Sequence, residues 1–471
     1  MPLVSDTHTL HVLTVDDLLV YDKFSGDVVA ALPQNDVDGA RDALARAVAA
    51  APAAAKTARH ERAAVLERAA RILDERSENV AHLIVTEAGK TIRQARKEVS
   101  RAINTLKLSA HEATANAGEV IPFESFPGGE GRRGWFSREP LGVIVAITPY
   151  NDALNLVAHK IGPAIAGGNT VVLKPSPHTP LTAQLMVDVL VEAGLPDDVI
   201  TVVRGDRSVA QALVSAREVR LVSFTGGFAT GRAIAAAAGI KRLAMELGGN
   251  APVIVFADAD LDSAVSACVS GAFWAAGQNC IGAQRLLVQR EMYERFVAAF
   301  VEATGRLVHG DPREETTDIG PMISASAAHA ARQTVLDAVA AGAHLRIGGT
   351  VEGSVMAPTV LTDVPRTCTV WTEEVFAPVV VIEPFDSEEA AIEAANDSEY
   401  ALQAGVFTQN LSRALRVADA IEAGGVMVND SSDYRLDAMP FGGAKYGSMG
   451  REGVRFAYEE MTQPKVISIL T

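Results

Sequence analysis

The sequence predicts an α/β chain with two doubly wound, Rossmann-like domains in succession. Short apolar segments alternate with helical segments from residue 142 to 248, and the alternation restarts at residue 250 and continues to about 430. Strands separated by helices of this length favour a parallel sheet covered on both faces. At 471 residues the chain is also too long for one ordinary core, which favours two or three domains.

The elements follow from this pattern in chain order. Residues 36–115 form amphipathic patterns rich in Ala, Arg and Glu and are predicted to be long helices. The Gly-rich, charged stretch ESFPGGEGRRGWFSREP (124–140) breaks the pattern and is predicted to be an exposed hairpin or arm. The first domain is expected to have strands in GVIVAIT, TVVLK, VITVV, RLVSF and KRLAMEL, and one of its helices ends at Gly194.

The second domain is expected to have strands in NAPVIVF, RLLVQ, EEVFAPVVVIEPF, ALQAGVFT and GVMVND. The chain from Pro440 onwards is expected to add a Gly-rich loop, a helix and a final strand. The uncharged run 263–284 contains Ser, Gln, Asn and Gly and is predicted to be a buried helix and loop rather than a membrane span.

Bulk composition narrows the function classes. The formal net charge of −16 disfavours nucleic acid or an anionic membrane as a partner, because both attract a basic face. Cys268, Cys280 and Cys368 are too far apart in sequence for a metal-ligand pattern or a disulfide framework. Residues 1–15 have no secretory signal pattern. A cytoplasmic enzyme or binding protein without a bound metal is therefore expected.

Cys280 is the first candidate for chemistry. It lies in FWAAGQNCIGAQR, between Gly277 and Gly282, which leave room for close approach of a substrate. Backbone N–H groups can stabilise a thiolate in such a loop. The alternative is an inert core thiol, the ordinary fate of a free cysteine. Cys268, at helical spacing among apolar residues, fits that alternative better.

Glu246 and Asn151 are two further candidates. Glu246, in AMELGGNAP, follows an apolar strand and precedes two glycines, so it is a possible buried general base or a carboxylate that caps a turn. Asn151 follows a strand and a Pro turn in ITPYNDALNLVAHK, and its amide is able to donate to an oxyanion. The alternative for Asn151 is a simple turn residue.

Two segments have features of a cofactor site. VSFTGGFATGRAIAAA runs from a strand through a Gly turn into a helix, which presents backbone N–H groups to a phosphate. Its spacing, Gly226-x4-Gly231, is not the dinucleotide fingerprint, and a plain tight turn is the alternative. Lys174 ends a predicted parallel strand, where ligands of open sheets bind, although a solvated lysine is equally compatible.

Taken together, FTGGFATG, MELGGNAP, GQNC, EEVFAPV and PFGGAKYGSMGRE resemble the aldehyde dehydrogenase superfamily over essentially the whole chain. The motifs occur in the order of that family, and Glu246 and Cys280 have the family's spacing of 34 residues. The resemblance implies an NAD- or NADP-dependent enzyme that oxidises an aldehyde. It also implies the aldehyde dehydrogenase fold, with a small β element for oligomerisation.

The resemblance implies a role for each matching residue. Cys280 corresponds to the nucleophile, Asn151 with the Cys280 N–H to the oxyanion hole, and Glu246 to the base that hydrolyses the thioester. Lys160 and Glu452 match a charged pair suspected in proton relay. The cofactor is expected to contact Ile147, Thr148, Pro149, Lys174, Ser176, Pro177, Thr225, Gly226, Gly227, Thr230, Leu247, Glu374 and Phe376.

Some positions depart from the family pattern. Pro177 stands where a Glu is frequent, which leaves the choice between NAD and NADP open because a 2′-phosphate meets less repulsion. Gly227 replaces the usual Ser, Ala377 replaces a usual Gly, and Gly447–Ser448 inverts the usual order. None of these departures removes a catalytic atom.

The substrate is expected to be a small polar or anionic aldehyde. NLVAHK, FTGG and VNDSSDYRLDAMPFGG are most similar to the branch that includes lactaldehyde, phosphonoacetaldehyde and non-phosphorylating glyceraldehyde-3-phosphate dehydrogenases. Phosphorylated-aldehyde enzymes commonly have Arg before the nucleophile, where this chain has Asn279. The expected substrate residues, each of which has a solvated or structural alternative, are Arg101, His159, Asn279, Ile281 and Arg435.

The sequence is also compatible with other functions and with more than one assembly state. A coenzyme-A-acylating enzyme is the alternative, which the presence of Glu246 disfavours, and a catalytically silent scaffold is a remote one. The strand KVISIL and the arm near Gly128 resemble oligomerisation elements and imply a homodimer or homotetramer. The implied division is a cofactor domain (1–121, 141–248 and a return at 440–458), a catalytic domain (249–439) and an arm (122–140 and 459–471).

Overall fold

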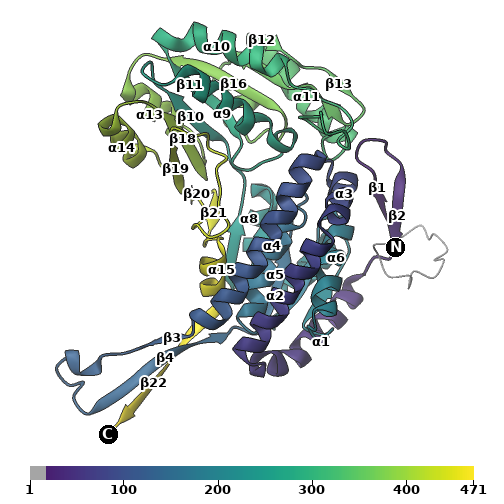
Figure 1. Cartoon of the computed structure of the whole chain (residues 1–471), viewed down its shortest axis with the longest axis vertical. Helices are drawn as coiled ribbons and strands as arrows, with labels where there is room; N and C mark the ends of the chain where they lie inside the picture. The colour runs from purple at the N-terminus through teal and green to yellow at the C-terminus, as the bar shows by residue number, and fades with distance from the viewer. Residues whose placement is uncertain (1–16) are drawn as a thin grey trace.

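The computed structural model describes residues 17–471 (Figure 1). Residues 1–15, in which no signal pattern is expected, lie outside this range. The described chain begins with a hairpin and four helices before the first large sheet. Their bounds are β1 (Leu18–Tyr21), β2 (Val28–Leu32), α1 (Val37–Lys56), α2 (Arg59–Glu75), α3 (Ser77–Ala88) and α4 (Ile92–Ala115).

The first large sheet has six strands in the order β21-β9-β8-β5-β6-β7, parallel except for β21. Alternate residues of a strand face opposite sides of the sheet, and both faces of this sheet are covered by helices. On β5, Ile144 and Ala146 pack against the helices α2–α6. Val143 and Val145 pack on the other face, against α1, α7 and α8. The bounds are β5 (Val143–Ile147), α5 (Asn155–Ala166), β6 (Thr170–Lys174), α6 (Pro180–Glu192), β7 (Ile200–Val202), α7 (Arg207–Ser215), β8 (Val219–Thr225), α8 (Phe228–Ala238), β9 (Arg242–Glu246) and β21 (Ser448–Met449).

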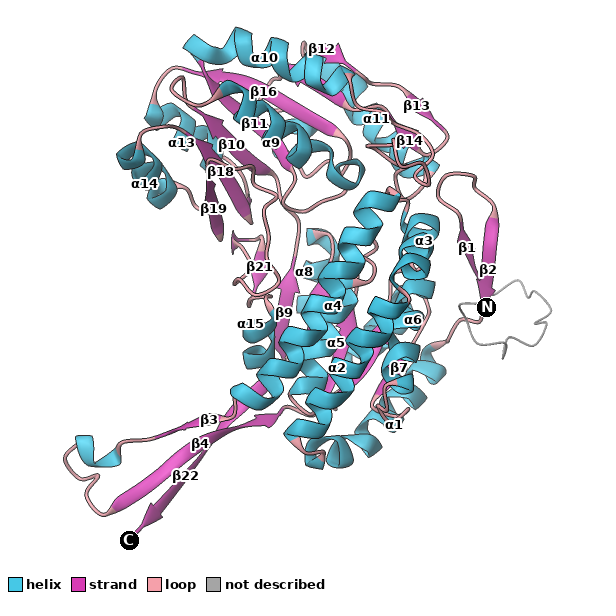
Figure 2. Ribbon diagram, in the orientation of Figure 1, coloured by secondary structure: helices cyan, strands magenta, loops and turns pink. Residues whose placement is uncertain are grey.

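The second large sheet has seven strands in the order β12-β15-β16-β11-β10-β18-β19, with only β12 antiparallel. Helices α9 and α10 pack on one face and α13 and α14 on the other (Figure 2). The bounds are β10 (Ala251–Val255), α9 (Leu261–Phe273), β11 (Ala283–Gln289), α10 (Arg290–Gly305), α11 (Ala325–Ala340), β12 (His344–Ile347), β15 (Thr359–Thr362), α12 (Thr369–Thr372), β16 (Val379–Phe385), α13 (Glu388–Asn396), β18 (Gln403–Phe407), α14 (Leu411–Ala420) and β19 (Gly425–Val428).

A three-stranded antiparallel arm, β22-β4-β3, projects from the body and has the C-terminus near its tip (Figure 1). Its strands leave apolar side chains exposed, among them Val120, Trp135, Val466 and Leu470. The bounds of the arm and the remaining short elements are β3 (Gly118–Val120), β4 (Arg132–Pro140), β22 (Thr462–Leu470), α15 (Val454–Glu460), β13 (Val351–Glu352), β14 (Val355–Met356), β17 (Tyr400–Ala401) and β20 (Ala444–Lys445), with 3-10 turns at Phe123–Ser125 and Trp274–Gly277.

The predicted α/β class with two parallel sheets is confirmed, and the stretch 124–140 does form a hairpin arm. One predicted strand begins later than expected. The backbone of 373–378 is a loop, with Phe376 at φ 52° and Pro378 next to the start of β16. Among the helices of the described residues, none combines the length and the apolar character needed to span a membrane.

Candidate active site

The loop that carries Cys280 is held in an unusual backbone conformation. Ala275, Ala276 and Gly277 are consecutively left-handed, with φ of 51°, 55° and 69°. A left-handed backbone conformation costs free energy for any residue other than glycine, and it persists only where the surrounding structure holds it in place. A Cβ on Gly277 would lie 2.0 Å from the carbonyl oxygen of Ala377, and one on Gly249 would lie 1.9 Å from that of Cys280. The close packing of these two glycines fixes the position of Cys280.

Cys280 opens into a cavity of about 380 Å³, whereas Cys268 is fully buried in the core. The lining includes Asn151, so the structure places Cys280 and the Asn151 side chain at the same cavity, and their catalytic roles stay predictions. Burial, and then the charge of Glu374, raise the pKa of the Cys280 thiol well above its ordinary value, while Arg435 opposes this. The thiol of the free protein is therefore neutral near pH 7, and its reaction requires a group that takes its proton.

Glu246 has the environment of a buried base. It ends β9, is 2% exposed, and its Oε2 has no hydrogen-bond partner in the described part of the chain. Burial, and then the nearby charge of Glu452, raise its pKa well above the ordinary carboxyl value. A carboxylate with a raised pKa is a stronger base than an exposed glutamate.

Glu452 lies at the centre of a buried ion-pair network. Its Oε1 accepts from Lys160 Nζ at 2.9 Å and from Thr225 Oγ1 at 3.1 Å, and its Oε2 accepts from Arg435 Nη2 at 3.0 Å. Burial alone would raise the pKa of Glu452, but the charges of Lys160 and Arg435 outweigh it and hold the pKa well below its usual range. The predicted contact between Lys160 and Glu452 is present. Its proton-relay role stays a prediction.

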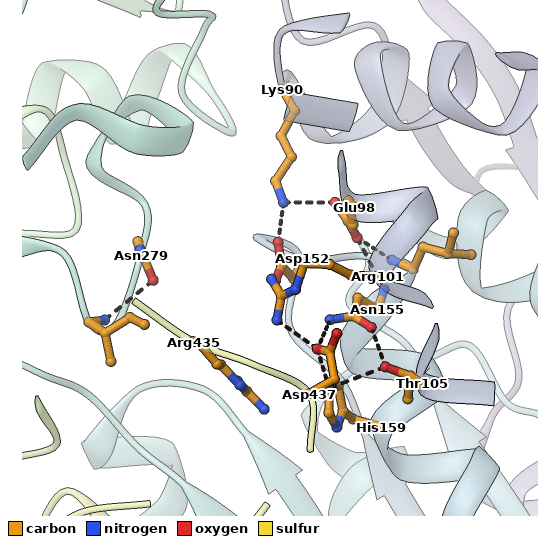
Figure 3. Close-up of polar contacts among 12 residues, drawn as sticks. Lys90, Glu98, Arg101, Thr105, Asp152, Asn155, His159, Asn279, Arg435 and Asp437 are labelled. Atoms are coloured by element: carbon orange, nitrogen blue, oxygen red, sulfur yellow. Dashed lines mark hydrogen bonds and ion pairs between the residues drawn. The ribbon is translucent and has the colours of Figure 1, made fainter. Parts of the chain in front are cut away.

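A second buried network fixes the segment that follows Asn151 (Figure 3). Lys90 Nζ donates to Glu98 at 2.7 Å and also to the carboxylate of Asp152. The other oxygen of Glu98 accepts from the backbone N–H groups of Leu154 and Asn155, at 2.7 and 3.2 Å, where α5 begins. This arrangement satisfies donors that a helix N-terminus otherwise leaves free.

Lys90 and Glu98 were not predicted as site residues, because no local pattern marks them. Their charges resemble those of the many other Lys and Glu residues in the helical region, and only the fold brings them to Asp152, more than fifty positions away. Burial alone would raise the pKa of Asp152, but Lys90 and Arg101 outweigh it and keep this carboxyl ionised. We infer that the network positions the Asn151 amide through its neighbour Asp152.

Replacing Lys90 with methionine is therefore expected to lower kcat/KM at least about tenfold, because a displacement near 1 Å at a catalytic group costs on the order of a hundredfold. It also removes the ammonium that Glu98 and Asp152 share and leaves Glu98 without an ion-pair partner in its buried position, so the melting temperature is expected to fall. Steady-state kinetics and thermal unfolding measure both effects. Lys107→Met, an exposed position on α4, is the control. Unchanged kinetics in Lys90→Met would contradict the positioning role.

A separate cavity of about 440 Å³ lies at the C-terminal edge of the six-stranded sheet. Ile147, Lys174 and Thr230 line it, together with Asp206 and Arg207. Lys174 is 8% exposed, and its Nζ forms no hydrogen bond or ion pair with another described residue. Burial lowers the pKa of Lys174, opposed by Asp206. A largely buried, unpaired ammonium at the carboxyl edge of a parallel sheet fits the hydroxyl or phosphate groups of a dinucleotide.

The other predicted cofactor residues lie in loops around the same edge, except Thr225, which ends β8. Glu374 Oε1 accepts from the N–H of Gly249 at 3.0 Å, and burial raises the pKa of Glu374 to about 8. Gly227 begins α8 without a side-chain cap, which leaves N–H groups available. The predicted residues outside the cavity lining are Thr148, Pro149, Ser176, Pro177, Thr225, Gly226, Gly227, Leu247, Glu374 and Phe376.

Four of the five predicted substrate residues line the Cys280 cavity: Arg101, Asn279, Ile281 and Arg435. The fifth, His159, does not. It is 1% exposed, its Nε2 lies 3.0 Å from Oδ1 of Asp437, and its face of α5 packs toward Thr105 of α4. His159 does lie on the helix that follows Asn151, as predicted. Its side chain points away from the cavity, because its direction depends on helix packing that the motif does not specify.

The comparisons with known proteins agree with this geometry. The sequence profile described as "Aldehyde dehydrogenase family" matches residues 14–467. The chain belongs to the aldehyde dehydrogenase family. An aspartate-semialdehyde dehydrogenase of Pseudomonas canavaninivorans is 56% identical to this aldehyde dehydrogenase over 450 residues, covering 96% of each chain.

Two solved structures have closely similar folds. Aldehyde dehydrogenase 21 of Physcomitrella patens, in complex with the reaction product succinate, has a TM-score of 0.94 and 39% identity, covering 97% of this chain and 96% of its own. A glyceraldehyde-3-phosphate dehydrogenase of Methanocaldococcus jannaschii, complexed with NADP, has a TM-score of 0.94 and 37% identity, covering 98% of this chain and all of its own. This aldehyde dehydrogenase is thus an oxidoreductase whose cofactor is NAD or NADP.

Proposed function

We propose that this aldehyde dehydrogenase oxidises a small, anionic aldehyde to its carboxylic acid. The observation that carries the proposal is that Arg101 and Arg435 line the same cavity as Cys280. The Arg435 side chain is 8% exposed, and its Nε has no partner among the described residues. Buried guanidinium groups favour the carboxylate or phosphate groups that a substrate supplies.

The relatives' names support an anionic substrate. They refer to aspartate semialdehyde, succinate and glyceraldehyde 3-phosphate, each of which carries a carboxylate or a phosphate. Asn279 precedes Cys280 where Arg is common in phosphorylated-aldehyde enzymes, and its Oδ1 accepts from the N–H of Ile281 at 3.3 Å. A carboxylate-bearing aldehyde is therefore favoured over a phosphorylated one.

In the proposed mechanism, the Cys280 thiol gives its proton to a water molecule in the cavity, and its sulfur adds to the aldehyde carbonyl. The Asn151 amide and the Cys280 N–H donate to the oxyanion of the resulting thiohemiacetal. NAD(P)+, which the cavity lined by Ile147, Lys174 and Thr230 would hold, would supply the hydride acceptor for oxidation of this adduct to a thioester on Cys280. Glu246 then takes a proton from water, the water oxygen adds to the thioester carbonyl, and the acid leaves as the Cys280 sulfur is released.

A panel of aldehydes tests the proposal by steady-state kcat/KM. Succinate semialdehyde and aspartate semialdehyde are expected to exceed lactaldehyde, glycolaldehyde and phosphonoacetaldehyde, and all to exceed long-chain alkanals. A clear preference for long apolar aldehydes would overturn the proposal. Product analysis with and without coenzyme A separates hydrolysis from the acylating alternative, since only the latter consumes the thiol.

We also propose that the chain is a cytoplasmic homodimer or homotetramer, with the domain division given by the family resemblance. The exposed apolar residues of the arm support association, because an apolar edge strand otherwise favours aggregation. Sedimentation velocity distinguishes the two assemblies. A monomer at micromolar concentration would argue against both.

A further inference from the structure

A third cavity, of about 390 Å³, lies at the opposite edge of the six-stranded sheet from the cavity that Lys174 lines. Its lining includes Asn169, which precedes β6, and Val199, which precedes β7. Lys174 is at the other end of β6, about 17 Å from Asn169 along an extended strand. The third cavity shares no lining residue with the Lys174 cavity or the Cys280 cavity, so it is a separate place on the molecule.

Arg62, in the first turn of α2, lines the third cavity and has no partner for its charge. It is 8% exposed, and its guanidinium forms no hydrogen bond or ion pair with another described residue. Its Nε and Nη1 are fully buried, which leaves Nη2 to face the cavity. Arg59, three residues earlier, instead donates to two backbone carbonyls and to the Tyr458 hydroxyl, at 2.7 to 3.3 Å.

The charge of Arg62 is not offset by an acidic residue. Burial, and then the charge of Arg59, lower the pKa of Arg62, opposed by Tyr458 and by no carboxylate of the described chain. A buried charge without a partner destabilises a fold, so Arg62 does not contribute to stability as an ion-paired arginine would. A group of this kind in a cavity is a candidate for binding a ligand of opposite charge.

The backbone beside Arg62 leaves room for its guanidinium but supplies no acceptor. A Cβ at Gly168 would lie 2.1 Å from Nη1 of Arg62, and Gly168 has a φ of 82°, so a glycine is required there. The adjacent Asn169 offers no acceptor either, because its Oδ1 already accepts from two backbone N–H groups, at 2.8 and 3.0 Å. The position of Arg62 is therefore set by packing, and its donors remain available.

The other polar groups of the lining add positive charge. Arg68 also lines the cavity, and only its Nε is used, in a bond of 2.7 Å to a backbone carbonyl. Among the described residues of the lining, Glu61 is the one carboxylate, and its Oε2 accepts from the N–H of Ala58 at 3.0 Å, where α2 begins. Two guanidinium groups beside the N-terminus of a helix favour a doubly charged anion such as a phosphate.

We propose that this cavity binds a small phosphate ester, whose phosphate group pairs with Arg62 and Arg68. The rest of the wall is largely apolar and suits the body of the ester; it includes Val65, Ile165, Leu195 and Pro196. A volume of about 390 Å³ is within the range of small-molecule sites and accommodates a sugar phosphate. The ligand is distinct from the aldehyde and the cofactor, so the inference does not depend on the proposed function.

Isothermal titration calorimetry with glucose 6-phosphate tests the site. The enzyme is first saturated with its dinucleotide cofactor, so that the phosphate group cannot bind at Lys174. Saturable binding is expected, with weaker binding of inorganic phosphate and none of glucose. Arg62→Met is expected to raise the Kd for glucose 6-phosphate at least about tenfold, the effect of losing a charge-assisted hydrogen bond. Arg71→Met, at an exposed position of α2, is the control and is expected to bind normally.

Three binding results would overturn the inference. One is the absence of saturable binding of either phosphate compound at millimolar concentration. Another is an unchanged Kd in Arg62→Met, which would place the phosphate elsewhere. The last is binding of inorganic phosphate without binding of glucose 6-phosphate, which would assign the cavity to the free ion.

Thermal unfolding in phosphate-free buffer separates a ligand-binding arginine from a structural one. Arg62→Met is expected to unfold at the same temperature as the wild type or higher, because the substitution removes a buried charge without a partner. Glucose 6-phosphate is expected to raise the melting temperature of the wild type but not that of Arg62→Met. A melting temperature several degrees lower in Arg62→Met without ligand would show that Arg62 is structural and would contradict the site.

Discussion

Replacing Cys280 with alanine is expected to abolish aldehyde oxidation, with kcat falling by about 10⁴-fold or more, as when other covalent nucleophiles are removed. The expectation follows from geometry. Of the three cysteines, only Cys280 lines any of the three cavities described above, and Asn151 lines the same cavity. Formation of reduced cofactor, followed in steady state with the preferred semialdehyde, measures the loss.

Cys268→Ala is the matched control for this prediction. Cys268 is fully buried on α9 and contributes only packing, so its loss is expected to lower stability modestly and leave kcat nearly unchanged. Circular dichroism of both variants distinguishes a missing nucleophile from a missing fold. Substantial turnover in folded Cys280→Ala would show that the thiol is not the nucleophile.

Much of the fold was predictable because its signals are local. All five residues of β6 are buried, as are six of the seven in β8, and continuous apolar runs of this kind favour a parallel sheet between helices. The arm at 124–140 was predictable because charge and glycine interrupt a helical pattern. The β1–β2 hairpin and the short strands β12–β15 were not predicted, since their residues are largely exposed or too few to show a period.

The candidate site was predictable where a motif specifies backbone and side chain together. Cys280 and Asn151 line the same cavity, and Lys160 and Glu452 form the predicted ion pair. The arrangement of the predicted substrate residues around the Cys280 cavity was less predictable, because it depends on contacts between distant segments. Lys90 reaches Asp152 and Arg101 reaches Asp437 only through helix packing, and the same packing turns His159 away from the cavity.

Glu246→Gln is expected to separate the two halves of the reaction. Glutamine keeps the shape of the side chain but is not basic, so the first hydride transfer continues while thioester hydrolysis slows by about 10²- to 10⁴-fold, the range for loss of a general base. A burst of reduced cofactor equal to the enzyme concentration is expected, followed by slow turnover. Mass spectrometry is expected to find the acyl group on Cys280. Glu352→Gln, at an exposed position of β13, is the control.

The pH dependence of hydrolysis gives the same prediction an independent test. Burial raises the pKa of Glu246, so its basic, ionised form is lost as the pH falls through a value well above the ordinary carboxyl range. The wild-type steady-state rate is therefore expected to rise with pH over that range, and Glu246→Gln is expected to lose this rise. If the burst itself disappears in Glu246→Gln, Glu246 is required before hydride transfer. Glu246 would then be the group that accepts the proton of the Cys280 thiol. A burst that survives with slow turnover assigns it to water instead, because only the second half-reaction then depends on the carboxylate.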